Sequence, residues 1–522
     1  MYGKKIRGNL QVTSKRPIVQ LLLINSICLL VLLLIAEPHY SFDTDVMMQA
    51  QLFNISGAWP TGMILFSNVY LGRFLKVLCG LSGHLNWYTI FQYAVIYLAL
   101  WKIGEQFLRT NRSWISHVMY IIFNVFVGYE CYINISYMKT AALLCISALY
   151  VIYGLVRGLY QKRSWLQYLY AGCSLILGGL ISWKAMLISV LVCLIGIVLF
   201  LLINRQVIER RQKRNTLITI IVAIALVCVL QIADYRAYDG LEQWSGVNRY
   251  RNTIEQVEMF GVPHYTSEIG DKTGLTKDQY SILTEGHYIT LDGSAFERLQ
   301  QVESMSHSVS GQRILHFMRT VPIGLFRVGM FCGNIVLWLL LIFSHKERKK
   351  LCLLMTGIIT GVAYLVMYFV ASCNTSIVHF LLLLPAMLLA LMNAEDMCVS
   401  VEERRSVVAF LLLGSLLLYH NLGSGMVTSV KHGDMEKKLT EEVTELEQPW
   451  HAICLNEYLK SYSAFERYDE GLIAGKNLVV LDGAYTLIPL YDGLIYPAGW
   501  NVDQPLDNVN IGDDFMIWMH VM

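Results

Sequence analysis

The sequence predicts an all-α polytopic membrane protein, on the strength of its composition, its charge and its long apolar runs. Of the 522 residues, 55% are hydrophobic and only 15% are charged, and the mean hydropathy is +0.47. Soluble chains carry about 25% charged residues, so a soluble globular enzyme is excluded. The net charge of only +2 likewise gives no basis for a nucleic-acid partner. The 12 Cys form no CxxC pair, so no zinc site or disulfide frame is expected.

Eleven apolar runs approach the length of about 20 residues that a helix needs to cross a bilayer. The fifth and sixth are separated only by residues 182–184, which predicts a tight hairpin. The predicted spans lie near residues 18–36, 87–104, 115–128, 141–157, 166–182, 186–203, 216–232, 322–343, 351–371, 378–392 and 406–421. The chain is therefore expected to be a multi-pass protein with about 11 transmembrane helices.

The basic residues of the short connections predict the orientation. With the N-terminus inside, the inner segments hold 21 Lys and Arg residues. The short outer connections hold only four, which are Arg73, Lys76, Lys139 and Lys184. Because cytoplasmic loops are enriched in Lys and Arg, we expect a cell-membrane protein with a cytoplasmic N-terminus and an extracytoplasmic C-terminus.

Two large loops and the tail fall on the outer face in this topology. The loops are residues 37–86 and 233–321, within a transmembrane domain of residues 1–421. The remaining part, 422–522, contains two short apolar runs that each end in Asp-Gly. Such runs are typical of strands closed by turns, so a small α/β outer module is expected there. Chemistry or recognition should occur outside, since every inner connection is short and basic.

The first outer loop carries the most informative residues, an acidic pair at i and i+2. Asp43 and Asp45 follow the first span directly and are separated by Thr44. One of them can act as a general base, or both can hold a divalent cation, for which their oxygen ligands favour Mg²⁺ or Mn²⁺. The alternative is a solvated loop or a helix N-cap, where Asp is common.

The layout and several short motifs resemble GT-C membrane glycosyltransferases. In that superfamily, too, a short inner N-terminus and one span precede acidic residues in the first outer loop. A further ten or so spans and an outer C-terminal part follow. The motifs similar to a bacterial branch of the superfamily are Gly57-Ala-Trp-Pro-Thr-Gly62, Phe66-Ser-Asn-Val-Tyr-Leu-Gly-Arg73, residues 134–140, 248–251, 274–280 and 288–292. One departure is that many members have adjacent acids, whereas Thr44 separates them here, which leaves the choice of base open.

The resemblance implies a sugar donor linked to a polyprenyl phosphate and a glycan, lipid or protein acceptor on the outer face. It implies that Asp43 or Asp45 is the catalytic base. The donor phosphate would be bound by Lys139, Lys184 and Arg73. The substrate would also be bound by Arg249 and Arg251 in the large loop.

Other interpretations remain open for these cations and for the whole chain. Lys184 in a Trp-Lys hairpin also fits a snorkelling anchor, and Arg73 with Lys76 also fits a contact with lipid head groups. A transporter or flippase for a lipid-linked saccharide is one alternative function. An O-antigen polymerase or ligase is another, because such proteins use Arg in outer loops, where Arg249 and Arg251 lie. The near absence of charged residues inside the predicted spans favours surface chemistry over translocation.

Overall fold

The structure is a computed structural model that describes most of the chain up to residue 393 and three short stretches beyond it. Its described part is mostly helical, which confirms an all-α membrane protein at this level. The described residues are 16–53, 62–82, 85–110, 114–160, 164–203, 209–240, 247–285, 295–305, 315, 329–342, 347–370, 376–393, 450–453, 463–465 and 477–480.

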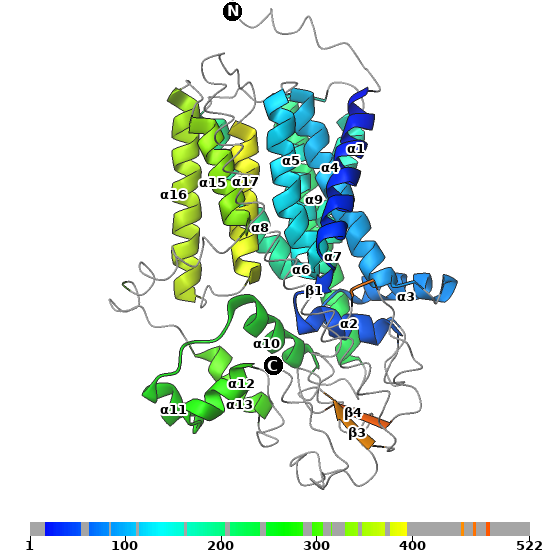
Figure 1. Ribbon diagram of the computed structural model, residues 1–522, viewed down its shortest axis with the longest axis vertical. Coiled ribbons are helices and arrows are strands. Elements are labelled where there is room, and N and C mark those ends of the chain that lie inside the picture. The colour runs from blue at the N-terminus through cyan, green and yellow to red at the C-terminus, as the bar shows by residue number, and fades with distance from the viewer. Residues whose placement is uncertain are drawn as a thin grey trace, which may run out of the picture.

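Ten helices run roughly alongside one another as a bundle (Figure 1). They are α1 (Arg16–Ile35), α4 (Trp87–Thr110), α5 (Trp114–Gly128), α6 (Tyr137–Val156), α7 (Ser164–Ile181), α8 (Trp183–Ile203), α9 (Arg210–Asp239), α15 (Gly329–Ile342), α16 (Glu347–Val370) and α17 (Ser376–Asn393). Each coincides with one of the predicted spans, and the predicted span at 406–421 lies outside the described residues. Within the described chain, α6, α7, α8 and α9 are long and apolar enough to cross a membrane.

Helix α6 forms the centre of the bundle. All of its residues are buried, and it packs against α4, α7 and α8. Small residues allow the close crossings: Gly178 lies against Cys145 of α6, and Gly196 lies against Leu389 of α17. Close packing through small residues is the usual way in which helices associate in a bilayer. The outer helices instead expose apolar stripes; on α8 this stripe is Leu187, Leu191, Ile195, Val198 and Leu202.

The shorter elements gather at one end of the bundle, which we call the α2 end (Figure 1). They are α2 (Asp43–Phe53), α3 (Val69–Leu81), the π-helical turn η1 (Tyr129–Ile133), α10 (Val247–Phe260), α11 (Ser267–Thr273), α12 (Lys277–Glu285), α13 (Ala295–Ser304), β1 (His39–Tyr40), β2 (Asn134–Ile135), β3 (Trp450–Ile453) and β4 (Asn477–Val480). Both predicted loop regions thus contribute helices to the same end of the molecule.

A small parallel sheet fixes the chain between α1 and α2. In this sheet β1 pairs with β2, with His39 opposite Asn134 and Tyr40 opposite Ile135. The backbone N–H of Ser41 extends the ladder to the carbonyl of Ile135 at 2.8 Å. Because β2 immediately precedes α6, the first turn of α2 is held beside the first turn of α6.

The C-terminal region contributes a second parallel pair, β3 with β4, in which Trp450 lies opposite Asn477. The strand at 477–480 lies where the first apolar run predicts one, whereas the second run, at 487–493, lies outside the described residues. Ala464 contacts the α2 end: its N–H bonds the carbonyl of Pro38 at 2.8 Å, and its carbonyl accepts from Thr89 Oγ1 at 2.6 Å.

Candidate functional site

Asp45 lies in the first turn of α2 and is completely buried. Its Oδ1 accepts hydrogen bonds from the Tyr88 hydroxyl at 2.7 Å and from the backbone N–H of Tyr137 at 3.0 Å. A third, longer bond of 3.4 Å comes from Nε2 of Gln92. Its Oδ2 is buried and has no hydrogen-bond partner among the described residues. One oxygen therefore holds the side chain in place, and the other has hydrogen-bonding capacity that no described residue uses.

The surroundings of Asp45 change its acidity. Burial raises the pKa of Asp45 from 3.8 to about 7, although the bonds from Tyr88 and Tyr137 and the nearby charge of Lys139 oppose this rise. The Tyr137 N–H is at the start of α6, where the helix dipole also favours a negative charge. A carboxyl group with a pKa near neutral pH both takes up and releases protons readily, which is what a general base requires.

Lys139 lies close to this carboxylate, but it is already paired. Its side chain is 1% exposed, and Nζ lies 2.9 Å from Glu130 Oε2 in η1. Nζ also donates to the backbone carbonyls of Glu130 and Asn134 and to Ser41 Oγ. Lys139 of α6, the predicted phosphate ligand, thus bonds to η1, to β2 and to Ser41 just before α2. Four acceptors surround its ammonium group.

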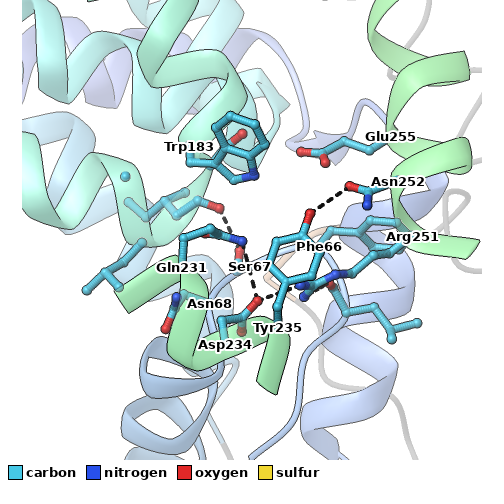
Figure 2. A pocket seen from close by; sticks show the side chains of 15 residues that line it. Phe66, Ser67, Asn68, Trp183, Gln231, Asp234, Tyr235, Arg251, Asn252 and Glu255 are labelled. Atoms are coloured by element: carbon cyan, nitrogen blue, oxygen red, sulfur yellow. Dashed lines mark hydrogen bonds and ion pairs between the residues drawn. The ribbon is translucent and has the colours of Figure 1, made fainter. Parts of the chain in front are cut away.

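Of the other predicted cations, Arg251 lines a pocket between the α7–α8 hairpin, α9, α10 and residues 65–68 (Figure 2). Lys184 is not part of the lining, but it follows the lining residue Trp183 and pairs with the lining residue Glu255. The pocket encloses about 300 Å³ of empty space, including its open mouth. Arg251 reaches Asp234 at 2.7 Å, and Lys184 reaches Glu255 at 2.9 Å. Figure 2 shows the Arg251 guanidinium directed at Asp234 and the Glu255 carboxylate directed into the same space.

Burial and charge shape this pocket. Arg251 is 5% exposed, and its guanidinium lies 4.6 Å from the centre of the Tyr235 ring and 4.7 Å from that of Tyr238. Burial raises the pKa of Glu255, and the ammonium of Lys184 opposes the rise. The pocket is therefore lined by one cation, Arg251, and two acids; Asp234 neutralises Arg251, and Glu255 pairs with Lys184 beside the pocket.

Two contacts connect the pocket helix α10 to α2 and α6. The backbone N–H and the hydroxyl of Thr44 both bond to Glu258 of α10, the hydroxyl at 2.7 Å. The Tyr137 hydroxyl lies near enough to Glu255 to lower the pKa of that carboxyl, after the larger effects of burial and Lys184. Asp45 and the pocket are thus parts of one polar region, with Thr44 and Tyr137 between them.

The remaining predicted site residues lie elsewhere or are only partly described. Asp43 is the first residue of α2, and its side chain lies outside the described part. Arg73 is exposed on α3, 6.0 Å from the centre of the Tyr70 ring. Arg249 is exposed and bonds to Gln300 of α13 rather than facing the pocket. In the described part of the chain, no group of three His, Cys, Asp or Glu residues is placed to hold a metal ion.

Sequence reasoning missed the acids that pair with the cations, and the tyrosine that holds Asp45. The missed residues are Tyr88, Gln92, Glu130, Asp234, Glu255 and Glu258. Asp234 could have been found from the sequence, because it directly follows the apolar run of α9. An acid at such a membrane boundary is usually paired with a cation.

No family model, no curated protein and no solved structure matches this chain.

Proposed function

We propose that this protein is a GT-C-like integral membrane glycosyltransferase of the cell membrane. In the proposed topology eleven spans place the N-terminus in the cytoplasm and the C-terminus outside, so that the α2 end is the extracytoplasmic end. The donor is a sugar linked to a polyprenyl phosphate, and the acceptor is a hydroxyl group of a glycan, lipid or protein.

The observation that carries this proposal is the buried Oδ2 of Asp45. It has no hydrogen-bond partner among the described residues, and the pKa of about 7 lets the group accept a proton near neutral pH. In the proposed step the acceptor oxygen attacks the anomeric carbon of the donor while Asp45 takes its proton. The bond from the anomeric carbon to the phosphate oxygen breaks, and polyprenyl phosphate leaves with that electron pair. Tyr88 and the Tyr137 N–H keep the carboxylate oriented during the step.

The pocket provides the proposed place for the donor phosphate. In this proposal Arg251 in the pocket lining and Lys184 beside it, near the starts of α10 and α8, supply positive charge in a partly buried setting where charge interactions are stronger than in water. Mg²⁺ is commonly held by one or two carboxylates together with substrate phosphates. In the described part of the chain no group of three His, Cys, Asp or Glu side chains includes Asp45, so the residues described there do not fit a bound metal ion.

The test is sugar transfer by the purified protein in lipid nanodiscs, with a panel of polyprenyl-phosphate hexoses as donors. We expect Asp45→Asn to reduce release of polyprenyl phosphate by a factor of roughly 10² to 10⁴, the usual contribution of a general base. Glu268→Gln is the matched control, because Glu268 is exposed and forms its ion pair with Lys272 on the same helix, α11. Asp43→Asn, tested in parallel, decides which acid is the base. Full transfer by both Asp variants contradicts the proposed site.

A second function, an O-antigen polymerase or ligase, is favoured by one observation. Arg251 is buried, paired and directed into the pocket, as an arginine that recognises a lipid-linked phosphate would be. With lipid-linked oligosaccharides as donors, this function predicts that Arg251→Lys abolishes chain transfer while Asp45→Asn retains it. The glycosyltransferase proposal predicts the opposite: Asp45→Asn should reduce transfer more than Arg251→Lys does.

A further inference from the structure

Helix α3 exposes an apolar face at the α2 end. The exposed large side chains of the helix are Tyr70 (45% exposed), Phe74 (51%), Val77 (65%) and Leu81 (75%). Their spacing of i, i+4, i+7 and i+11 puts all four on one side of a 3.6-residue helix. The opposite side of the helix, which includes Leu71, Gly72 and Leu75, is buried against the protein. A helix at an aqueous surface would expose polar residues instead.

The attachment of α3 fixes which way this stripe faces. A Cβ on Gly72 would come within 2.4 Å of the carbonyl oxygen of Gly62, so only glycine permits this approach. Lys76 Nζ donates to the carbonyl of Leu52 at the end of α2, at 2.9 Å. Asn68 caps the helix through the N–H of Tyr70 and donates to the carbonyl of Leu230 in α9. The helix is therefore held at its N-terminal end and at its middle, which fixes the direction in which its apolar face points.

The stripe continues into an exposed apolar strip on the bundle. The Phe74 ring meets the Phe91 ring edge-on, with 6.5 Å between their centres. Phe91 is in the second turn of α4, and the exposed residues Ala94 and Leu98 follow it at i+3 and i+7. Figure 1 shows α3 lying across the direction of the bundle helices at the α2 end. The stripe is thus continuous with exposed apolar residues on the side of α4.

We propose that α3 is a membrane-surface helix whose partner is the phospholipid leaflet at the α2 end. The stripe of Tyr70, Phe74, Val77 and Leu81 inserts among the upper parts of the acyl chains, as the apolar faces of interfacial helices do. Tyr70 and the flanking Arg73 suit the head-group level, where aromatic rings and lipid phosphates meet. Through the bond from Lys76 to the end of α2, the leaflet sets the depth of the helix that carries Asp45. This inference is independent of the proposed glycosyltransferase activity.

The experiment measures depth in the bilayer at single positions. A small environment-sensitive fluorescent amino acid replaces Val77 in the full chain, which is reconstituted in phosphatidylcholine–phosphatidylglycerol nanodiscs. Quenching is measured with lipids that carry a nitroxide on the acyl chain, and separately with aqueous iodide. The same amino acid at Lys272 of α11, whose side chain is 60% exposed, is the water-facing control.

We expect severalfold stronger quenching by acyl-chain nitroxide at position 77 than at position 272, and the reverse order with iodide. At position 73, lipids labelled on the head group should quench better than lipids labelled on the acyl chain. A label at Phe74 repeats the measurement if the Val77 variant does not fold. Iodide quenching at 77 equal to that at 272 overturns the proposal, because the face is then in water. Failure of both quenchers at 77 also overturns it, because protein then covers the face.

Discussion

Replacing Asp45 by Asn is expected to stabilise the protein at neutral and alkaline pH, although it removes the proposed base. The reason is the raised pKa of the buried carboxyl group. In the unfolded chain this group loses its proton near pH 3.8, whereas in the folded protein it keeps the proton up to about pH 7. Between these values the unfolded state binds fewer protons, so the stability of the wild-type protein falls as the pH rises.

The size of the effect follows from the difference between the two pKa values. The interval from 3.8 to about 7 spans roughly three pH units, and each unit corresponds to 1.36 kcal/mol, so the full loss is about 4 kcal/mol. About 3 kcal/mol of this falls between pH 5 and pH 8. Above pH 7 the carboxyl group is ionised in both states and the loss stays constant. An Asn at this position does not titrate, so the free energy of unfolding of the variant does not fall with pH for this reason.

The assay is thermal unfolding of both proteins in nanodiscs from pH 5 to pH 8. The amide of the variant also leaves a buried N–H without a partner, but this cost does not depend on pH and cancels when one protein is compared across the pH range. The advantage of Asp45→Asn over the wild type should therefore grow up to about pH 7 and then level off. Glu268→Gln should show no such growth, because Glu268 is exposed. An unchanged difference between pH 5 and pH 8 would refute the raised pKa.

Three further predictions concern the same region. Tyr88→Phe removes a hydrogen bond that lowers the pKa of Asp45, so the pH above which the free energy of unfolding stops falling should move above 7. At pH 8, thermal unfolding should show a loss of about 1–3 kcal/mol in the free energy of unfolding. Lys139→Met leaves Glu130 without its ammonium partner and should cost about 3–5 kcal/mol, whereas Lys139→Met with Glu130→Gln should recover most of the melting temperature. Chelation by EDTA should leave sugar transfer unchanged; loss of transfer that is restored by Mg²⁺ or Mn²⁺ would instead assign Asp43 and Asp45 to a metal.

The helical part of the fold could be predicted because it depends on local pattern. Apolar runs of membrane length specify helices directly, and a described helix coincides with ten of the predicted spans. The strand at 477–480 followed from a short apolar run ending in Asp-Gly. The position at which α2 begins, Asp43, also depends on local pattern, because the helix dipole favours an acid at a helix N-terminus.

The pairing of the site residues could not be predicted, because it depends on contacts between distant segments. Thr44 and Glu258 are 214 residues apart, and nothing in either segment indicates the other. The sequence pattern therefore singled out Lys184 and Arg251 as candidate phosphate and substrate ligands, but nothing in it indicated that Glu255 and Asp234 pair with them. The same limit applies to Arg73, which is exposed on α3 and is not among the residues that line the pocket.

The paired state of the cations has a consequence for donor binding. A phosphate that reaches Lys184 must compete with Glu255, which lies 2.9 Å from the ammonium group. In the proposed site, a phosphate close to Glu255 would disfavour the charged form of this carboxyl, whose pKa burial already raises. Glu255 would therefore both hold Lys184 in position before a donor binds and oppose a second anion at the same ammonium, so the free energy of donor binding would include the cost of weakening this ion pair.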